Sequence, residues 1–294
     1  MYDIAKKSAV HQNAVPPVLL LNVLTAAAIW SIALLAPFVL PTDFVSSVPE
    51  FTEPLKRASQ IGLQTHLLMF CKSMLVGASW TCAFFAMKHL PISIATPIRA
   101  SSPLWTILFA VGFMGERPGV MQWLGIIVVL SAFFVFSRVG AIEGIHFHRD
   151  RWVALMVIAT LLGAASALYD KYLLQHASLS PSVVQAWFSI YLVPVMMPLT
   201  IRWYRRERKT NRFQWRWSIP MIALLLLVAD FAYFTAITDE HAMIAVISPI
   251  RRTSIIISFL YGIVRLKEQN WRAKGPCIVA VVIGVALLSW PAPT

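Results

Sequence analysis

Among the ionisable side chains inside long apolar stretches of this sequence, four are candidate functional residues. Arg99 and Arg251 each follow a proline by two residues. Asp230 is near the middle of a third stretch, and Lys72 lies about two turns into a fourth. A charge at the centre of a bilayer costs at least about 2.5 kcal/mol, so such groups face the protein interior or a wet cavity. We predict substrate binding by Arg99 and Arg251, whose guanidinium forks suit carboxylates or phosphates, and coupling or gating by Asp230 and Lys72.

Each of these charges also has a purely structural interpretation. The arginines and Lys72 can extend along the helix to the membrane surface, or donate to helix carbonyls. Asp230 can form a structural ion pair with Lys72, Arg251 or Arg252. The sequence alone leaves these alternatives open.

Prolines and aromatic residues accompany the charges. Pro97 and Pro249 lie two residues before the arginines, and a proline within a helix frees a carbonyl and permits a kink. We predict that these kinks act in gating and aim the arginines at a cavity. Trp80 and Tyr233 occupy mid-membrane positions where they can line an amphiphilic pocket, although core packing is the alternative.

Composition places the chain in a membrane. Hydrophobic residues make up 58% of the sequence and charged residues only 13%, whereas soluble domains carry about 25% charged residues. Crossing a hydrocarbon core of about 30 Å takes about 20 helical residues. Nine apolar runs of suitable length occur, and lipid requires them to be helices: Val18–Leu40, Leu67–Met87, Ile92–Met114, Val120–Ser137, Trp152–Tyr172, Val183–Ile201, Trp217–Ile237, Ala242–Val264 and Ala273–Trp290.

The chain contains an internal duplication. Ile94–Glu116 recurs 152 residues later as Val246–Glu268, with proline, arginine and the final glutamate at the same offsets. We therefore predict two repeats, 1–140 and 141–294. The second repeat has five spans, whereas the first has four and lacks its first helix. An odd number of spans per repeat inverts one repeat relative to the other, which is the arrangement of many alternating-access transporters.

These residues resemble a known family. The paired proline-containing helices, which close in Gly115-Glu116 and in Lys267-Glu268, are similar to those of the drug/metabolite transporter superfamily, specifically its EamA-type members. The resemblance covers nearly the whole chain. It implies an all-α polytopic membrane helical bundle with inverted five-helix repeats and a solute as substrate.

Charge also predicts orientation and excludes some partners. Seventeen Lys and Arg residues lie on the side of the N-terminus and four on the other, which predicts a cytoplasmic N-terminus and an external C-terminus. The resemblance implies instead that both termini are cytoplasmic, and we favour the charge count. The basic residues lie in short loops, so we expect membrane lipids rather than nucleic acid as partners. No metal or cofactor motif, catalytic constellation or P-loop occurs.

Taken together, these features predict a secondary active transporter rather than an enzyme. It would move a small metabolite or drug-like solute across a bacterial plasma (inner) membrane by alternating access, as a monomer or homodimer. The two arginines favour an anionic or zwitterionic solute. The alternative is a lipid flippase or lipid-modifying intramembrane protein, with the Arg202–Arg216 loop binding anionic headgroups.

Overall fold

A computed structural model describes most of the chain as helices. It covers residues 2–41, 49–114, 119–142, 149–239 and 271–288, together with 257, 261, 264 and 290. Within these residues, five helices are long and apolar enough to cross a membrane, which confirms an all-α, multi-pass membrane bundle. They are α2 (Val15–Val39), α5 (Leu63–His89), α9 (Arg151–Lys171, continued by a π-helical turn, Tyr172–His176), α10 (Pro181–Arg206) and α11 (Ser218–Ile237).

The chain divides into two compact units, each taking segments from both halves of the sequence. Unit 1 comprises Met1–His11, Ala78–Leu168 and His241–Thr294. Unit 2 comprises Gln12–Gly77 and Tyr169–Glu240. The repeat boundary near residue 140 and the inversion of the repeats stay predictions.

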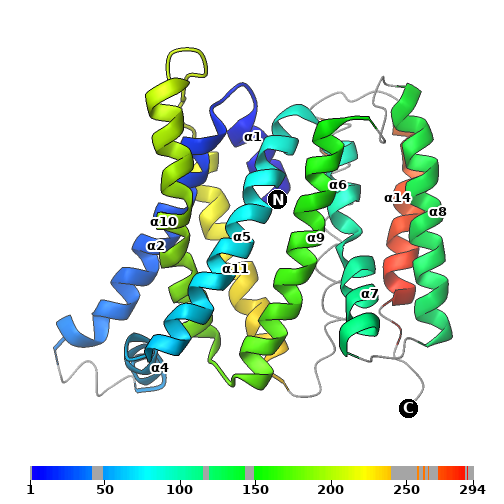
Figure 1. Cartoon of the computed structure of the whole chain (residues 1–294). Coiled ribbons are helices and arrows are strands. Elements are labelled where there is room, and N and C mark those ends of the chain that lie inside the picture. Colours follow the sequence, from blue (N-terminus) through cyan, green and yellow to red (C-terminus); the bar gives the residue numbers. More distant parts are fainter. Residues whose placement is uncertain are drawn as a thin grey trace. The chain divides into compact units, whose positions relative to one another are not determined.

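Helices α2 and α10 form an antiparallel pair in unit 2 (Figure 1). Near one end, Thr200 Oγ1 donates a hydrogen bond to the carbonyl of Pro16 at 3.1 Å. Near the other end, Leu34 packs in one buried cluster with Val183 and Ala186. The loop between α2 and α5 contributes a short helix, α4 (Pro49–Ser59), to the same cluster.

A glycine allows α5 and α10 to approach closely in unit 2. A Cβ atom built on Gly77 would lie 2.6 Å from Val195 Cγ1 and 3.2 Å from Met196 Cε. Small residues at such crossings let membrane helices pack through direct van der Waals contact. This packing holds α5 in place against α10, and α5 carries Lys72.

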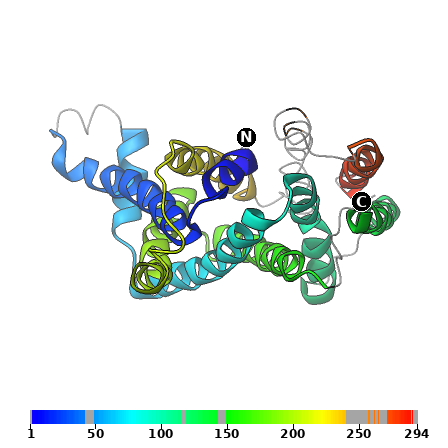
Figure 2. The same cartoon turned by 90° about the horizontal axis from the view of Figure 1, so that it is seen from above.

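Unit 1 contains a second close helix pair, α8 (Val120–Ile142) and α14 (Trp271–Leu288). The two helices lie side by side in both views (Figures 1 and 2). A Cβ atom on Gly284 would lie 2.6 Å from Val129 Cγ2 and 3.1 Å from the carbonyl oxygen of Gly125. The predicted spans Val120–Ser137 and Ala273–Trp290 correspond to these helices.

One predicted span is interrupted. Instead of a single helix over Ile92–Met114, the structure has α6 (Ile92–Ala100) and α7 (Ser102–Met114). Pro103 lacks an N–H, and its ring clashes with the carbonyl of residue 99 in a continuous helix. At the junction, Ser101 Oγ donates to the carbonyl of Ile98 at 2.6 Å. The break therefore lies at Ser101, four residues beyond Pro97. Pro249, Arg251 and most of the predicted span Ala242–Val264 lie outside the described residues.

Candidate functional site

The centre of unit 2 holds a buried ion pair between α5 and the last turn of α9. Lys72 Nζ bonds Asp170 Oδ1, and the two side chains are only 1% and 7% exposed. Nearby, Tyr169 donates its hydroxyl hydrogen to the carbonyl of Leu68 at 3.2 Å, which fixes the register of the two helices. Lys72 therefore does not extend to the membrane surface, and its partner is Asp170, which the sequence-based alternatives did not include.

Aromatic rings surround the ammonium group of Lys72. Its Nζ lies 4.9 Å from the ring centroids of both Phe188 on α10 and Phe234 on α11. The two rings meet edge to face, with centroids 6.1 Å apart. Ser73 Oγ donates to the carbonyl of Phe188 at 3.0 Å and so fixes this part of α10 against α5. The rings add a cation–π attraction, which is strongest where water is excluded.

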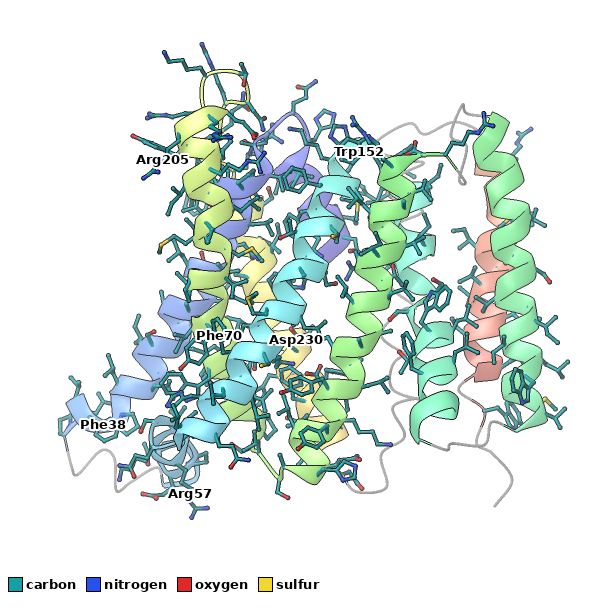
Figure 3. The ribbon with its side chains drawn as sticks, in the orientation of Figure 1. Phe38, Arg57, Phe70, Trp152, Arg205 and Asp230 are labelled. Carbon is teal, nitrogen blue, oxygen red and sulfur yellow. The ribbon has the colours of Figure 1, made fainter. Side chains whose placement is uncertain are left out.

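A second carboxyl group lies one helical turn from these rings. Asp230 precedes Phe234 by four residues, so the two side chains share a face of α11. Asp230 is 8% exposed and Tyr233 4%, and the Tyr233 ring lies 5.5 Å from that of Phe234. Figure 3 shows Asp230 between the ends of unit 2 that Arg205 and Arg57 mark. Phe234 thus contacts both Lys72 and Tyr233, and Asp230 lies one turn before it on α11.

Gln185 supplies a hydrogen-bond acceptor to this region. Its Nε2 donates to the carbonyl of Leu227 on α11 at 2.7 Å, which fixes the orientation of the amide. Its Oε1 is buried and has no hydrogen-bond partner among the residues that the structure describes. Buried polar atoms are nearly always satisfied, so an orphaned acceptor is a candidate ligand contact. Sequence analysis missed Gln185 because an uncharged amide in an apolar span carries little information.

An aromatic cluster lies on the α4 side of Lys72 along α5. The ring of His66 meets that of Trp187 edge to face, 4.5 Å apart, and His66 Nδ1 shares a 2.9 Å hydrogen bond with the Tyr191 hydroxyl. Phe70 completes the cluster against Tyr191. Trp187 Nε1 also donates to the carbonyl of Ala58 on α4 at 2.6 Å. These contacts connect α4, α5 and α10 at that end of the unit.

Comparisons with known proteins match the first part of the chain to a family. The model of the EamA-like transporter family matches residues 14–138, which include α2, α5 and most of α8. This match covers less than half of the chain. It confirms the recognition made from the duplicated motif.

Individual relatives match shorter stretches. The pseudopaline exporters of two Pseudomonas aeruginosa strains are 40% identical over 55 residues, which is 18% of this chain and 19% of theirs. An uncharacterized transporter from the cobO 3' region of Sinorhizobium sp is 27% identical over 87 residues, 30% of this chain and 62% of that protein. The chain thus spans about a fifth of the length of the exporters that it matches.

Two further predicted site residues lie in the EamA-like segment, within unit 1. Trp80 on α5 is 9% exposed. Arg99 is partly exposed, but its Nη1 is buried and has no acceptor among the described residues. The adjacent carbonyl of Ile98 accepts from Thr160 Oγ1 at 3.4 Å, which ties α6 to α9. Arg99 thus retains an unused charged donor beside the break between α6 and α7.

Proposed function

We propose that this protein is a secondary active transporter that moves a small zwitterionic metabolite or drug-like solute across a bacterial plasma membrane by alternating access. The observation that carries the proposal is the buried Lys72–Asp170 ion pair, with Asp230 nearby, inside membrane helices. Intramembrane ionisable residues mark substrate paths and proton relays. The EamA-like match and the transporter names of the relatives support the same class.

The geometry suits a solute that carries both signs of charge. When the site is empty, Lys72 and Asp170 neutralise each other. A carboxylate can replace Asp170 at Lys72, while an ammonium group bonds the released carboxylate and the orphaned Oε1 of Gln185. The rings of Phe188 and Phe234 attract a cation and exclude water. A singly charged solute would leave one buried charge without a partner, a penalty of about 3–5 kcal/mol.

Alternating access follows from the predicted inverted duplication. Inverted repeats place a central site between two halves that exchange conformation, and each conformation opens the site to one face. Asp230 is our candidate for coupling, because protonation would remove its charge and change the balance around Lys72. Pseudopaline, named in the matching exporters, is a first solute to test.

Transport assays in liposomes test this proposal. Purified protein should accumulate pseudopaline or a zwitterionic amino acid under an imposed pH gradient, and should discriminate against a quaternary ammonium ion and a dicarboxylate. Asp230→Asn should abolish gradient-driven accumulation but retain exchange of labelled for unlabelled solute. Asp239→Asn is the matched control, since Asp239 is exposed just beyond the end of α11, and it should accumulate solute like the wild type.

Two outcomes would contradict the proposal. Gradient-driven accumulation that is unchanged in Asp230→Asn would remove this residue from coupling. Relocation of fluorescent phospholipid between leaflets, without uptake of any soluble compound, would favour the alternative of a lipid flippase. In a flippase, the preference for zwitterionic solutes that we propose for the Lys72 site would have no function.

A further inference from the structure

The loop that follows α10 carries a concentration of positive charge outside the transport site. Seven arginines and lysines and a single acid, Glu207, occur between Arg202 and Arg216. The part of this segment that follows α10, Glu207–Arg216, is called the basic loop below. Arg208, Lys209 and Arg212 are exposed. None of the three forms a salt bridge with a residue in the described part of the chain. Their charges are therefore available to an anionic ligand.

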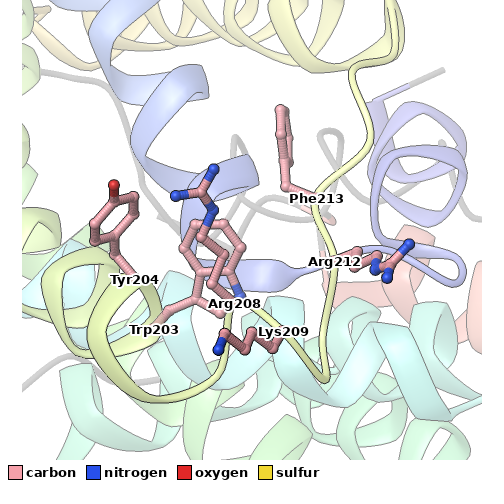
Figure 4. Close-up of a pocket in the computed structure, with 6 residues that line it drawn as sticks. All are labelled: Trp203, Tyr204, Arg208, Lys209, Arg212 and Phe213. Atoms are coloured by element: carbon pink, nitrogen blue, oxygen red, sulfur yellow. The ribbon is translucent and has the colours of Figure 1, made fainter.

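The basic loop and the end of α10 line an open pocket of about 720 Å³. Trp203 and Tyr204 lie on the last turns of α10, whereas Arg208 and Lys209 lie in the turn after it and Arg212 and Phe213 lie further along the loop (Figure 4). The Arg208 guanidinium carbon is 4.8 Å from the centroid of the Tyr204 ring. The lining is three cations and three aromatic rings: Trp203, Tyr204, Arg208, Lys209, Arg212 and Phe213.

Hydrogen bonds shape this pocket before any ligand binds. Trp203 Nε1 donates to the carbonyl of Asn211 at 2.8 Å, which draws the loop back over α10. Asn13, at the start of α2, both donates to the carbonyl of Gln214 and accepts from its N–H, each at 2.8 Å. Asn13 is fully buried. A preformed site of this kind orders few side chains when it binds, which favours affinity.

The pocket lies at the depth of lipid headgroups. It begins where the membrane helix α10 ends, at Arg206. Trp215 and Trp217, immediately after it, are 53% and 80% exposed. Exposed tryptophans beside a span are typical of the membrane interface, where the ring contacts acyl chains and the indole N–H contacts headgroups. A phospholipid can therefore reach the pocket laterally from the bilayer.

We infer that this pocket binds the headgroup of an anionic phospholipid. Arg208, Lys209 and Arg212 would hold the phosphate through charge-assisted hydrogen bonds. The rings of Trp203 and Phe213 would contact the glycerol and the first carbons of the acyl chains. A zwitterionic lipid such as phosphatidylcholine places its own cation among these basic groups, so the pocket should discriminate against it.

Native mass spectrometry of the delipidated full-length protein tests this inference. Titration with phosphatidylglycerol should show a saturable first site that phosphatidylcholine fills much more weakly. Arg208→Gln/Arg212→Gln should weaken the first phosphatidylglycerol site by about thirty-fold, because each basic residue near an anionic headgroup contributes about a factor of five. Inorganic phosphate at millimolar concentration should not displace the lipid, since it lacks the apolar contacts.

A matched variant separates the pocket from general positive charge. Arg205→Gln/Arg206→Gln removes the same charge from the preceding turn of α10 without altering the pocket lining, and should change the affinity by less than about three-fold. Equal weakening in both double variants would overturn the inference in favour of diffuse attraction. Equal binding of the two lipids would also overturn it, and displacement by inorganic phosphate would identify the site as one for a soluble anion.

Discussion

Removal of either member of the Lys72–Asp170 pair should destabilise unit 2 strongly. Both side chains are almost completely buried, at 1% and 7% exposed. Lys72→Met keeps the length and apolar character of the lysine chain but leaves the Asp170 carboxylate without its cation. Breaking a buried pair in this way costs about 3–5 kcal/mol, most of it from the uncompensated charge. Asp170→Asn should cost less, because Phe188 and Phe234 still contact the ammonium group.

The double variant should recover much of this loss. Lys72→Met/Asp170→Asn leaves neither charge in the low-dielectric interior, and replacement of a complete buried pair by uncharged groups is often close to neutral. We therefore expect a coupling energy of at least about 2 kcal/mol in a double-mutant cycle. The free energy of unfolding would be measured by denaturant titration in mixed micelles, with helix content followed by circular dichroism.

The chain offers a control pair of the same chemistry. Lys56 and Glu53 on α4 are 3.1 Å apart, but their side chains are 36% and 51% exposed. Their coupling in the same cycle should be about 0.2–1 kcal/mol and should decrease in 1 M salt, whereas that of the buried pair should not. If the two cycles gave equal couplings, or if the Lys72 and Asp170 effects simply added, the buried-pair reasoning would be refuted.

Three further outcomes test other parts of the structure. Gly77→Ala should lower the free energy of unfolding by about 1–3 kcal/mol, because the new Cβ meets Val195 Cγ1 at 2.6 Å. Gly112→Ala is the control and should be neutral or stabilising, because nothing lies within 4 Å of the new Cβ. A larger loss of stability in Gly112→Ala than in Gly77→Ala would contradict the close helix crossing. Asn13→Ala should release the basic loop and speed its cleavage by trypsin, while an unchanged digestion rate would show that these hydrogen bonds do not hold the loop. Arg99→Lys should weaken solute binding by about 1–3 kcal/mol, and Arg99→Ala should weaken it more. Wild-type transport in both variants would assign Arg99 a structural role.

Several features could be predicted from the sequence because they depend on local or repeated patterns. The length and apolarity of each run determine whether it can cross a bilayer, so α2, α5, α9, α10 and α11 were expected within a few residues of their ends. The duplicated proline–arginine motif was sufficient to recognise the family. Charges inside apolar runs identified Asp230 and Lys72 as residues that require a polar environment, whatever the packing.

Helix interruption was harder to predict. Prolines are common in membrane helices, and Pro97 and Pro103 both lie within the same apolar run. A proline is tolerated in the first turn of a helix, which is where Pro103 lies in α7, but it would disrupt a continuous helix over Ile92–Met114. The break at Ser101 also depends on the local hydrogen bonds to Ile98, which hydropathy does not encode.

Only the tertiary structure decided which charges meet. Lys72 and Asp170 are 98 residues apart, and many helix registers are compatible with the same hydropathy pattern. Asp170 lies two residues before the end of the predicted span Trp152–Tyr172, and Gln185 is uncharged, so neither was singled out. The close approach of α5 and α10 at Gly77, together with the Tyr169–Leu68 hydrogen bond, sets the register that buries the pair. Apolarity along the chain thus determines that a residue is within the membrane, whereas the relative rotation and translation of packed helices determine its partners.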